Sequence, residues 1–238
     1  LEQVGTKGLV QDETNSNIYY YKGTNDEVTN NHLWYGGHHW RIMEIDTEAN
    51  TLLLVSQQPL TSIHSSSAVW TSQKEYENSY VNTWLNEYFY NSLDGSIQNN
   101  IKDNTFNVGI YTDVDEITTN QKVGLLDADQ YTKSGGQNSY LDIKDTFLLG
   151  NRSDSTYIRI VFYTGRFDVY NPSHVITGIL PNGAAIRPVI KISDITITEG
   201  DGTLESNYKV ADKSSNTSNI QVGEYIKVPY SGSDSACG

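Results

Sequence analysis

Residues 163–174 bring together side chains of the types that binding surfaces use. Aromatic rings and an arginine cover apolar or planar parts of a ligand, and short polar groups adapt to its hydrogen bonds. We therefore predict a ligand-binding surface in this segment, formed by Tyr163, Arg166, Asp168, Tyr170 and His174. The alternative is a β-hairpin in which the same aromatic residues form ordinary cross-strand pairs.

Two further side chains suit either a binding site or the core. Trp70 ends a polar loop, and we expect it either to add an exposed ring to the binding surface or to fill the core. Arg187 lies in an apolar, strand-like run, so we expect it to be partly buried. A buried guanidinium needs a carboxylate or helix carbonyl groups as partners, and the predicted role is structural rather than catalytic.

A cluster of acidic residues within 112–116 suggests a bound cation. Asp113, Asp115 and Glu116 supply hard oxygen atoms at close spacing, the donor type that Ca²⁺ prefers. Acidic loops are also commonly solvated turns, and that alternative stays open. We expect no required cofactor, and structural calcium at these three residues is the metal that the sequence suggests.

The remaining chemistry-bearing residues show no catalytic arrangement. His38 and His39 are neighbours in a predicted strand, where successive side chains point to opposite faces, so we do not expect them to share a metal ion. The sequence contains no Gly-x-Ser-x-Gly elbow and no glycine-rich phosphate loop. We find no nucleophile with a base beside it, and we expect a protein that is not an enzyme.

The composition narrows the partners and the location. The chain of 238 residues has 16 basic and 29 acidic residues, so its net charge of -13 repels nucleic acid and anionic membrane surfaces. A single Cys excludes an internal disulfide framework and a Cys-rich metal site. Many Tyr, Asn, Ser and Thr residues beside few Lys and Arg are typical of extracellular β-rich modules of bacteria. We therefore expect an extracellular or cell-surface protein that neither binds nucleic acid nor inserts into a membrane.

The N-terminal half carries the strongest β-strand signals. Strand-forming runs occur at 18–21, 33–35, 39–45 and 51–56. Gly36-Gly37 separates two of these runs and is a signal for a two-residue hairpin turn. The last three runs are therefore predicted to form a meander.

Two helices are expected. Apolar side chains at helical spacing predict an amphipathic helix over 79–93 that Asp94-Gly95 can end, namely Val81, Trp84, Leu85 and Tyr88. A shorter helix begins after Asp127, which can form a capping box with Gln130, and it ends at Gly135-Gly136. Further strands are predicted at 123–126, 147–149, 157–163, 187–192 and 195–198.

Composition along the chain suggests four segments. Residues 1–17 are polar and weakly patterned and are predicted to be a leading arm, and 18–210 form the domain. Residues 211–221 are a polar linker. Residues 222–238 start a following module or form a tail, which suggests that the chain is one unit of a multidomain protein.

The order of the motifs resembles a surface-domain family of Gram-positive bacteria whose function is unassigned. The resemblance covers residues 18–210 and rests on the segments 19–23, 30–37, 40–43, 81–93, 123–126, 139–141, 185–190 and 200–203. That family is similar to the C-type lectin-like fold in the variant shared with formylglycine-generating enzymes. The resemblance implies an α+β domain with twisted antiparallel sheets, two helices and long loops. It also implies that loops between 149 and 185 face the ligand.

These observations favour a noncatalytic module, secreted or on the cell surface, that recognises a protein or glycan through its late loops. The neighbouring modules of its parent chain are the other expected partners. A structural spacer or filament subunit is an alternative. An oxidase of the formylglycine-generating type is disfavoured, because its chemistry implies a pair of active-site cysteines in the late region and this chain has one Cys in all, Cys237.

Overall fold

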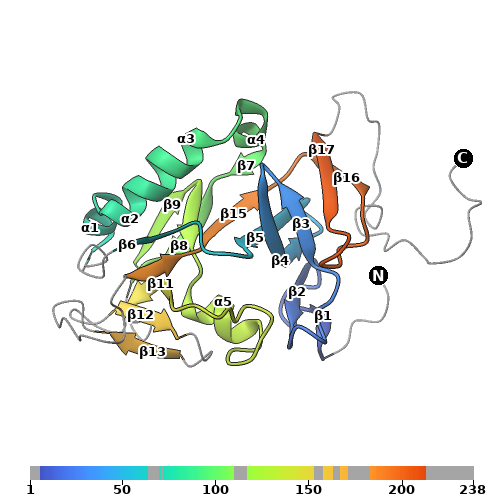
Figure 1. Cartoon of the computed structure of the whole chain (residues 1–238), viewed down its shortest axis with the longest axis horizontal. Helices are drawn as coiled ribbons and strands as arrows, with labels where there is room; N and C mark the ends of the chain where they lie inside the picture. Colours follow the sequence, from blue (N-terminus) through green and yellow to red (C-terminus); the bar gives the residue numbers. More distant parts are fainter. Residues whose placement is uncertain are drawn as a thin grey trace, which may run out of the picture.

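The computed structural model describes residues 6–63, 70, 72–109, 117–152, 158–162, 167–170 and 183–212. The described chain is a mixed α+β structure built mostly of strands, with few helices. Figure 1 shows helices α1 to α3 along one side of a curled main sheet, with a smaller sheet at one end. Strands β16 and β17 lie at the opposite end of the molecule (Figure 1). The α+β class predicted from the sequence is confirmed.

The main sheet joins strands from both ends of the chain. Its path in the described chain is β10 (Val123–Leu125), β15 (Pro188–Ile192), β5 (Thr51–Ser56), β4 (His38–Asp46), β3 (His32–Tyr35), β17 (Tyr208–Asp212) and β16 (Ile195–Glu199). Three more strands attach beside this path: β1 (Gly8–Gln11), β2 (Ile18–Lys22) and β7 (Ile101–Lys102). β17 runs parallel to β3, whereas the other pairs in this sheet are antiparallel among the residues described.

The predicted meander of β3, β4 and β5 is confirmed. Gly36 and Gly37 join β3 to β4 and have φ angles of 59° and 79°, which side-chain-bearing residues rarely adopt. Two consecutive positive φ angles give the turn whose twist matches that of the flanking strands. The Trp40 indole N–H then donates to the Tyr35 carbonyl at 2.9 Å, which ties the hairpin together.

A smaller sheet carries the late strands. Its order in the described chain is β13 (Phe167–Tyr170), β12 (Ile158–Val161), β11 (Phe147–Arg152), β14 (Ala184–Ile186) and β6 (Thr61–Ile63). β11 and β14 are parallel, so this sheet also departs from the antiparallel sheets that the resemblance implies. A separate pair consists of β8 (Asn104–Asn107) and β9 (Thr118–Gln121).

The long helix forms where it was predicted, but with an inserted wide turn. After α1 (Gln73–Glu77), α2 (Tyr80–Thr83) continues into a π-helical segment, Trp84–Phe89, and α3 (Tyr90–Ser92). A π-turn adds a residue to each turn. Phe89 therefore takes the buried position expected for Tyr88, which is 60% exposed. The Phe89 ring stacks on Trp84 at a centroid separation of 5.8 Å.

The ends of the helices follow their capping residues. Ser79 accepts from the Asn82 amide at the start of α2, and Asp94 precedes a further helix, α4 (Gly95–Asn100). The short helix α5 (Ala128–Lys133) has the predicted capping box between Asp127 and Gln130. Gly135 and Gly136 follow α5 with positive φ, as the sequence predicted.

The N-terminal boundary predicted from the sequence is wrong. Residues 8–11 are not a leading arm, because β1 pairs with β2 in antiparallel register. At the other end, β17 extends to Asp212, two residues into the predicted linker. The rest of that linker and the expected following module or tail, 213–238, lie outside the described residues. None of the helices described is long and apolar enough to cross a membrane.

Candidate functional site

A groove lies on the hairpin of β1 and β2. Its volume is about 630 Å³, within the usual range for ligand sites of about 300–1,000 Å³. Its walls are formed by Thr6, Val10, Gln11, Asp12, Glu13, Thr14, Ser16, Tyr20 and Lys22. We call this feature the hairpin groove. It combines one aromatic ring with many hydrogen-bonding groups, which suits binding of a polar ligand.

Strand register explains the composition of the groove. Val10 lies opposite Tyr20, and Gly8 lies opposite Lys22, so these residues share one face of the hairpin. Tyr21 points to the other face and is buried in the core. Gly8 contributes no side chain opposite Lys22, which leaves that end of the face open.

The turn between the two strands is held by Asp12. Its Oδ1 accepts from the Thr14 amide at 2.9 Å, from the Thr14 hydroxyl at 2.6 Å and from the Asn15 amide at 3.2 Å. Such bonds from an Asp to the backbone that follows are the usual way to fix a tight loop. The outer wall of the groove is therefore shaped before any ligand binds.

Lys133, the last residue of α5, braces the hairpin through contacts with three of its neighbours. Its Nζ lies 2.8 Å from Asp12 Oδ2 and 3.9 Å from Glu44 Oε2. The same ammonium sits 4.3 Å from the centre of the Tyr20 ring. The hydrogen bond from Lys133, followed by those from Thr14, holds the pKa of Asp12 well below its usual range. Burial raises the pKa of Glu44, against the opposing effect of Lys133.

A second ion pair holds the start of β1. Lys7 Nζ lies 2.5 Å from Glu27 Oε1, and the other carboxylate oxygen of Glu27 accepts from the Thr24 amide at 2.9 Å. Both ends of β1 are thus tied to parts of the domain that are distant in the sequence. The hairpin groove is part of the domain and not of a mobile extension.

The adjacent histidines point to opposite faces, as predicted. His38 packs edge-on against Phe89 at 5.4 Å, whereas His39 Nε2 lies 2.9 Å from His32 Nδ1. Burial, and then the nearby charge of Arg41 and the His39 ring, lower the pKa of His32 to about 3. Among the residues described, no group of three or more His, Cys, Asp or Glu is placed to hold a metal ion.

Arg187 is buried, but its partners differ from those expected. Its side chain is 1% exposed and donates from Nε to the Ser56 carbonyl at 2.9 Å and from Nη1 to the Leu141 carbonyl at 2.5 Å. Neither acceptor is a carboxylate or lies in a helix. Burial, and then the charge of Arg41, lower the pKa of Arg187 to about 10. The guanidinium joins separate loops and strands of the core.

The structure decides between the two interpretations of Trp70. The side chain is 1% exposed and its indole N–H donates to the Val108 carbonyl at 2.9 Å. Its ring meets that of Tyr76 edge-on at 5.0 Å. Trp70 therefore fills the core, and its prediction as an exposed binding residue is wrong. The loop position in the sequence could not reveal the carbonyl that satisfies the indole.

The predicted late-loop surface is described only in part. Asp168 and Tyr170 lie in β13, in backbone register with Ile160 and Ile158 of β12. The other members of the predicted sites, Tyr163, Arg166, His174, Asp113, Asp115 and Glu116, lie outside the described residues.

Sequence reasoning missed the hairpin groove because it assigned 1–17 to a leading arm. Two signals were available. Leu9-Val10 is a short apolar run after Gly8, and Asp12 is followed by Thr14 and Asn15, a common turn composition. These signals favour a strand at β1 that pairs with Ile18–Lys22 across a turn. They do not indicate the ion pair between Lys133 of α5 and Asp12.

Comparisons with known proteins cover the middle of the chain. Residues 49–145 match the model of a family described as a domain of unknown function, DUF6273. This segment begins in the turn before β5 and ends after α5, and it spans under half of the chain. Searches of curated proteins and of solved structures give no match.

Proposed function

We propose that the chain is a noncatalytic binding module of a secreted or cell-surface protein, and that it recognises a protein or glycan ligand. The observation that carries the proposal is the hairpin groove. It has the volume of a ligand site, an aromatic ring on its wall and a loop already fixed by Asp12. Such preorganisation lowers the entropy lost on binding.

The proposal includes a C-type lectin-like fold and an origin in a Gram-positive surface protein. The α+β class, the helix over 80–92 and the small late sheet are consistent with that fold. Residues 163–174 are proposed as a second contact surface, with Asp168 and Tyr170 on the edge strand β13 of the described sheet. Structural calcium at Asp113, Asp115 and Glu116 remains part of the proposal.

The test compares the half-buried Tyr20 of the groove with the exposed Tyr88. The wild-type chain and the variants Tyr20→Ala and Tyr88→Ala are screened against immobilised bacterial and host glycans and surface proteins. A ring at the centre of a site contributes about 2 kcal/mol or more, so Tyr20→Ala is expected to weaken binding at least about thirtyfold. Tyr88→Ala, on the outer face of the helix, should bind as the wild type does. Absence of binding by the wild-type chain, or equal effects of both variants, would reject the groove.

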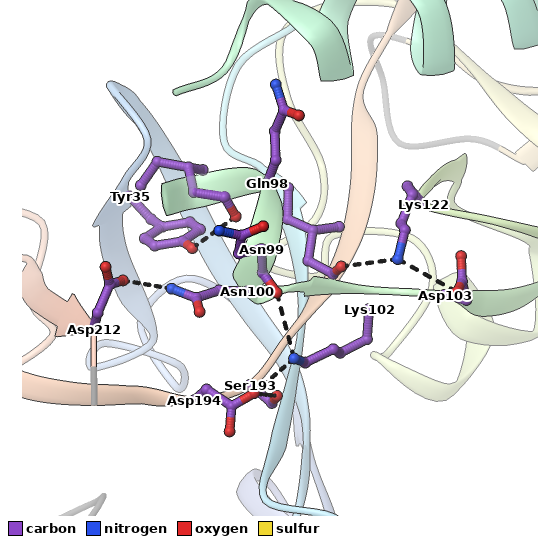
Figure 2. Close-up of polar contacts among 12 residues, drawn as sticks. Tyr35, Gln98, Asn99, Asn100, Lys102, Asp103, Lys122, Ser193, Asp194 and Asp212 are labelled. Atoms are coloured by element: carbon purple, nitrogen blue, oxygen red, sulfur yellow. Dashed lines mark hydrogen bonds and ion pairs between the residues drawn. The ribbon is translucent and has the colours of Figure 1, made fainter. Parts of the chain in front are cut away.

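A second candidate, a structural spacer, is favoured by the polar contacts where β17 ends. Figure 2 shows Asn100 pointing at Asp212, the last residue of β17. The Asn100 amide donates to Asp212 Oδ1 at 2.5 Å, and Lys102 Nζ lies 2.6 Å from Asp194 Oδ2. The first bond ties the end of the last described strand to α4, and the second ties β7 to the turn between β15 and β16, as a force-bearing connection would need. Small-angle scattering of a longer tandem chain distinguishes a rigid rod from flexibly linked units, and flexible units would reject the spacer.

A further inference from the structure

The wall of the hairpin groove has the chemistry of a saccharide site. We infer that the groove binds an uncharged glycan, with one sugar ring packed against Tyr20. This inference rests on the proposed function and specifies its ligand class and contacts. It concerns a surface remote in the sequence from the late loops.

Tyr20 supplies the apolar part of the site. Its ring lies on the groove face beside Val10, its cross-strand partner. The Lys133 ammonium lies 4.3 Å from the centre of the same ring and helps to hold it in place. A fixed aromatic ring beside an aliphatic side chain presents a flat apolar surface. The C–H face of a pyranose ring is the apolar part of an otherwise polar ligand, and it fits such a surface.

The rest of the wall offers both donors and acceptors. Gln11 donates from Nε2 to the Ser16 carbonyl at 2.8 Å and to the Tyr19 hydroxyl at 3.2 Å, which leaves Oε1 to accept. Glu13 is exposed and accepts only, whereas Lys22 donates only. Sugar hydroxyls donate and accept at once, so they match a wall that mixes the two kinds of group.

The charges of the wall disfavour an ionic ligand. The carboxylate of Asp12 is already engaged by Lys133 and by the turn that it holds. Glu13 and Lys22 carry one charge of each sign. The whole chain has a net charge of -13, which opposes the approach of phosphate-bearing or sialylated polymers. An uncharged saccharide adds no charge beside Glu13 and Lys22, and the net negative charge of the chain does not repel it.

The experiment is a glycan array with neutral, acidic and amino-sugar arms, beside a panel of surface proteins. The best ligand of any class is then titrated calorimetrically against the wild type, Tyr20→Phe, Tyr20→Leu and Glu13→Gln. Tyr20→Leu keeps apolar bulk without the ring, and Glu13→Gln changes an exposed group for which the described part of the chain shows no hydrogen bond or ion pair. Far-UV circular dichroism and thermal unfolding confirm that each variant is folded. Trp34→Ala, at an exposed aromatic residue that does not line the groove, is the control.

The inference predicts neutral glycans as ligands. Tyr20→Phe should retain the affinity, Tyr20→Leu should lower it at least about tenfold, and Glu13→Gln should lower it several-fold, since each lost contact is worth about 1 kcal/mol or more. Binding of an acidic glycan, an amino sugar or a protein that still depends on Tyr20 would overturn the inference but keep the proposed function. Binding that Tyr20→Leu and Glu13→Gln leave unchanged would overturn both.

Discussion

Basic side chains have different partners at the hairpin and in the core. At the hairpin, Lys133 is 37% exposed and lies near two carboxylates and a ring. In the core, Arg41 and Arg187 are each 1% exposed and bind carbonyl and amide oxygens instead. Exposed ion pairs contribute little to stability, whereas a buried donor leaves unpaired oxygens when it is removed. The comparison indicates that the core arginines serve the fold, whereas the hairpin ion pairs add little to its stability.

The largest expected effect is on Arg187. Arg187→Met removes the donors to the Ser56 and Leu141 carbonyls and should lower the free energy of unfolding by about 3 kcal/mol or more. Urea denaturation followed by tryptophan fluorescence measures the change. Arg187→Lys keeps the charge but cannot donate to both carbonyls at once, so its loss of stability should lie between those of the wild type and Arg187→Met. An ordinary surface substitution changes the free energy of unfolding by less than about 0.5 kcal/mol. A loss that small for Arg187→Met would mean that the core arginine stabilises the fold no more than the exposed hairpin charges do.

The next effect concerns the imidazoles beside Arg41. The folded-state pKa of His32 is about 3, below the value of about 6.5 for an unfolded chain, so folding favours the neutral ring. The contribution of His32 is present above about pH 6.5 and is lost as the pH falls toward 3. From about pH 6.5 to about pH 4, the loss should approach 3 kcal/mol, since each pKa unit is worth about 1.4 kcal/mol.

Unfolding free energies of the wild type and His32→Asn across this range isolate that contribution. The variant should show a shallower fall in stability with acid than the wild type does. Identical slopes would mean that His32 is not held neutral by burial beside Arg41.

The smallest effect is expected at the hairpin. Lys133→Gln removes the ion pair to Asp12 and the contact with the Tyr20 ring and should cost about 1 kcal/mol. The pKa of Asp12, followed by NMR, should rise toward its ordinary value because Lys133 is the largest cause of its depression. Lys209→Gln, in an exposed pair with Glu199, is the control and should leave that pKa unchanged. A loss as large as that of Arg187→Met would contradict the comparison.

Signals confined to a few residues were enough to predict much of the fold. The capping box of α5, the Gly36-Gly37 turn and the β3–β5 meander all depend on neighbours in the sequence. The apolar stripe also predicted the helix over 79–93. It could not reveal the π-helical turn, because the stacking of Trp84 on Phe89 is not part of an α-helical spacing.

The candidate site was largely beyond the sequence because its contacts are long-range. Lys133 and Asp12 are 121 residues apart, and Lys7 and Glu27 are 20 apart. In the sequence alone, polar residues such as these are typical of a solvated arm, because their partners are distant in the chain. Trp70 fails as a binding residue for the same reason, since its partner Val108 is distant in the chain.

The central claim, that the hairpin groove is the binding site, is tested most directly by NMR. The ¹⁵N-labelled chain is titrated with its best ligand from the array, and amide shift changes are mapped onto the structure. We expect the largest changes at Val10 to Ser16 and at Tyr20 and Lys22, with little change around Trp34 or Tyr88. Changes confined to those two aromatic residues, or to 163–174, with the hairpin unaffected, would contradict it.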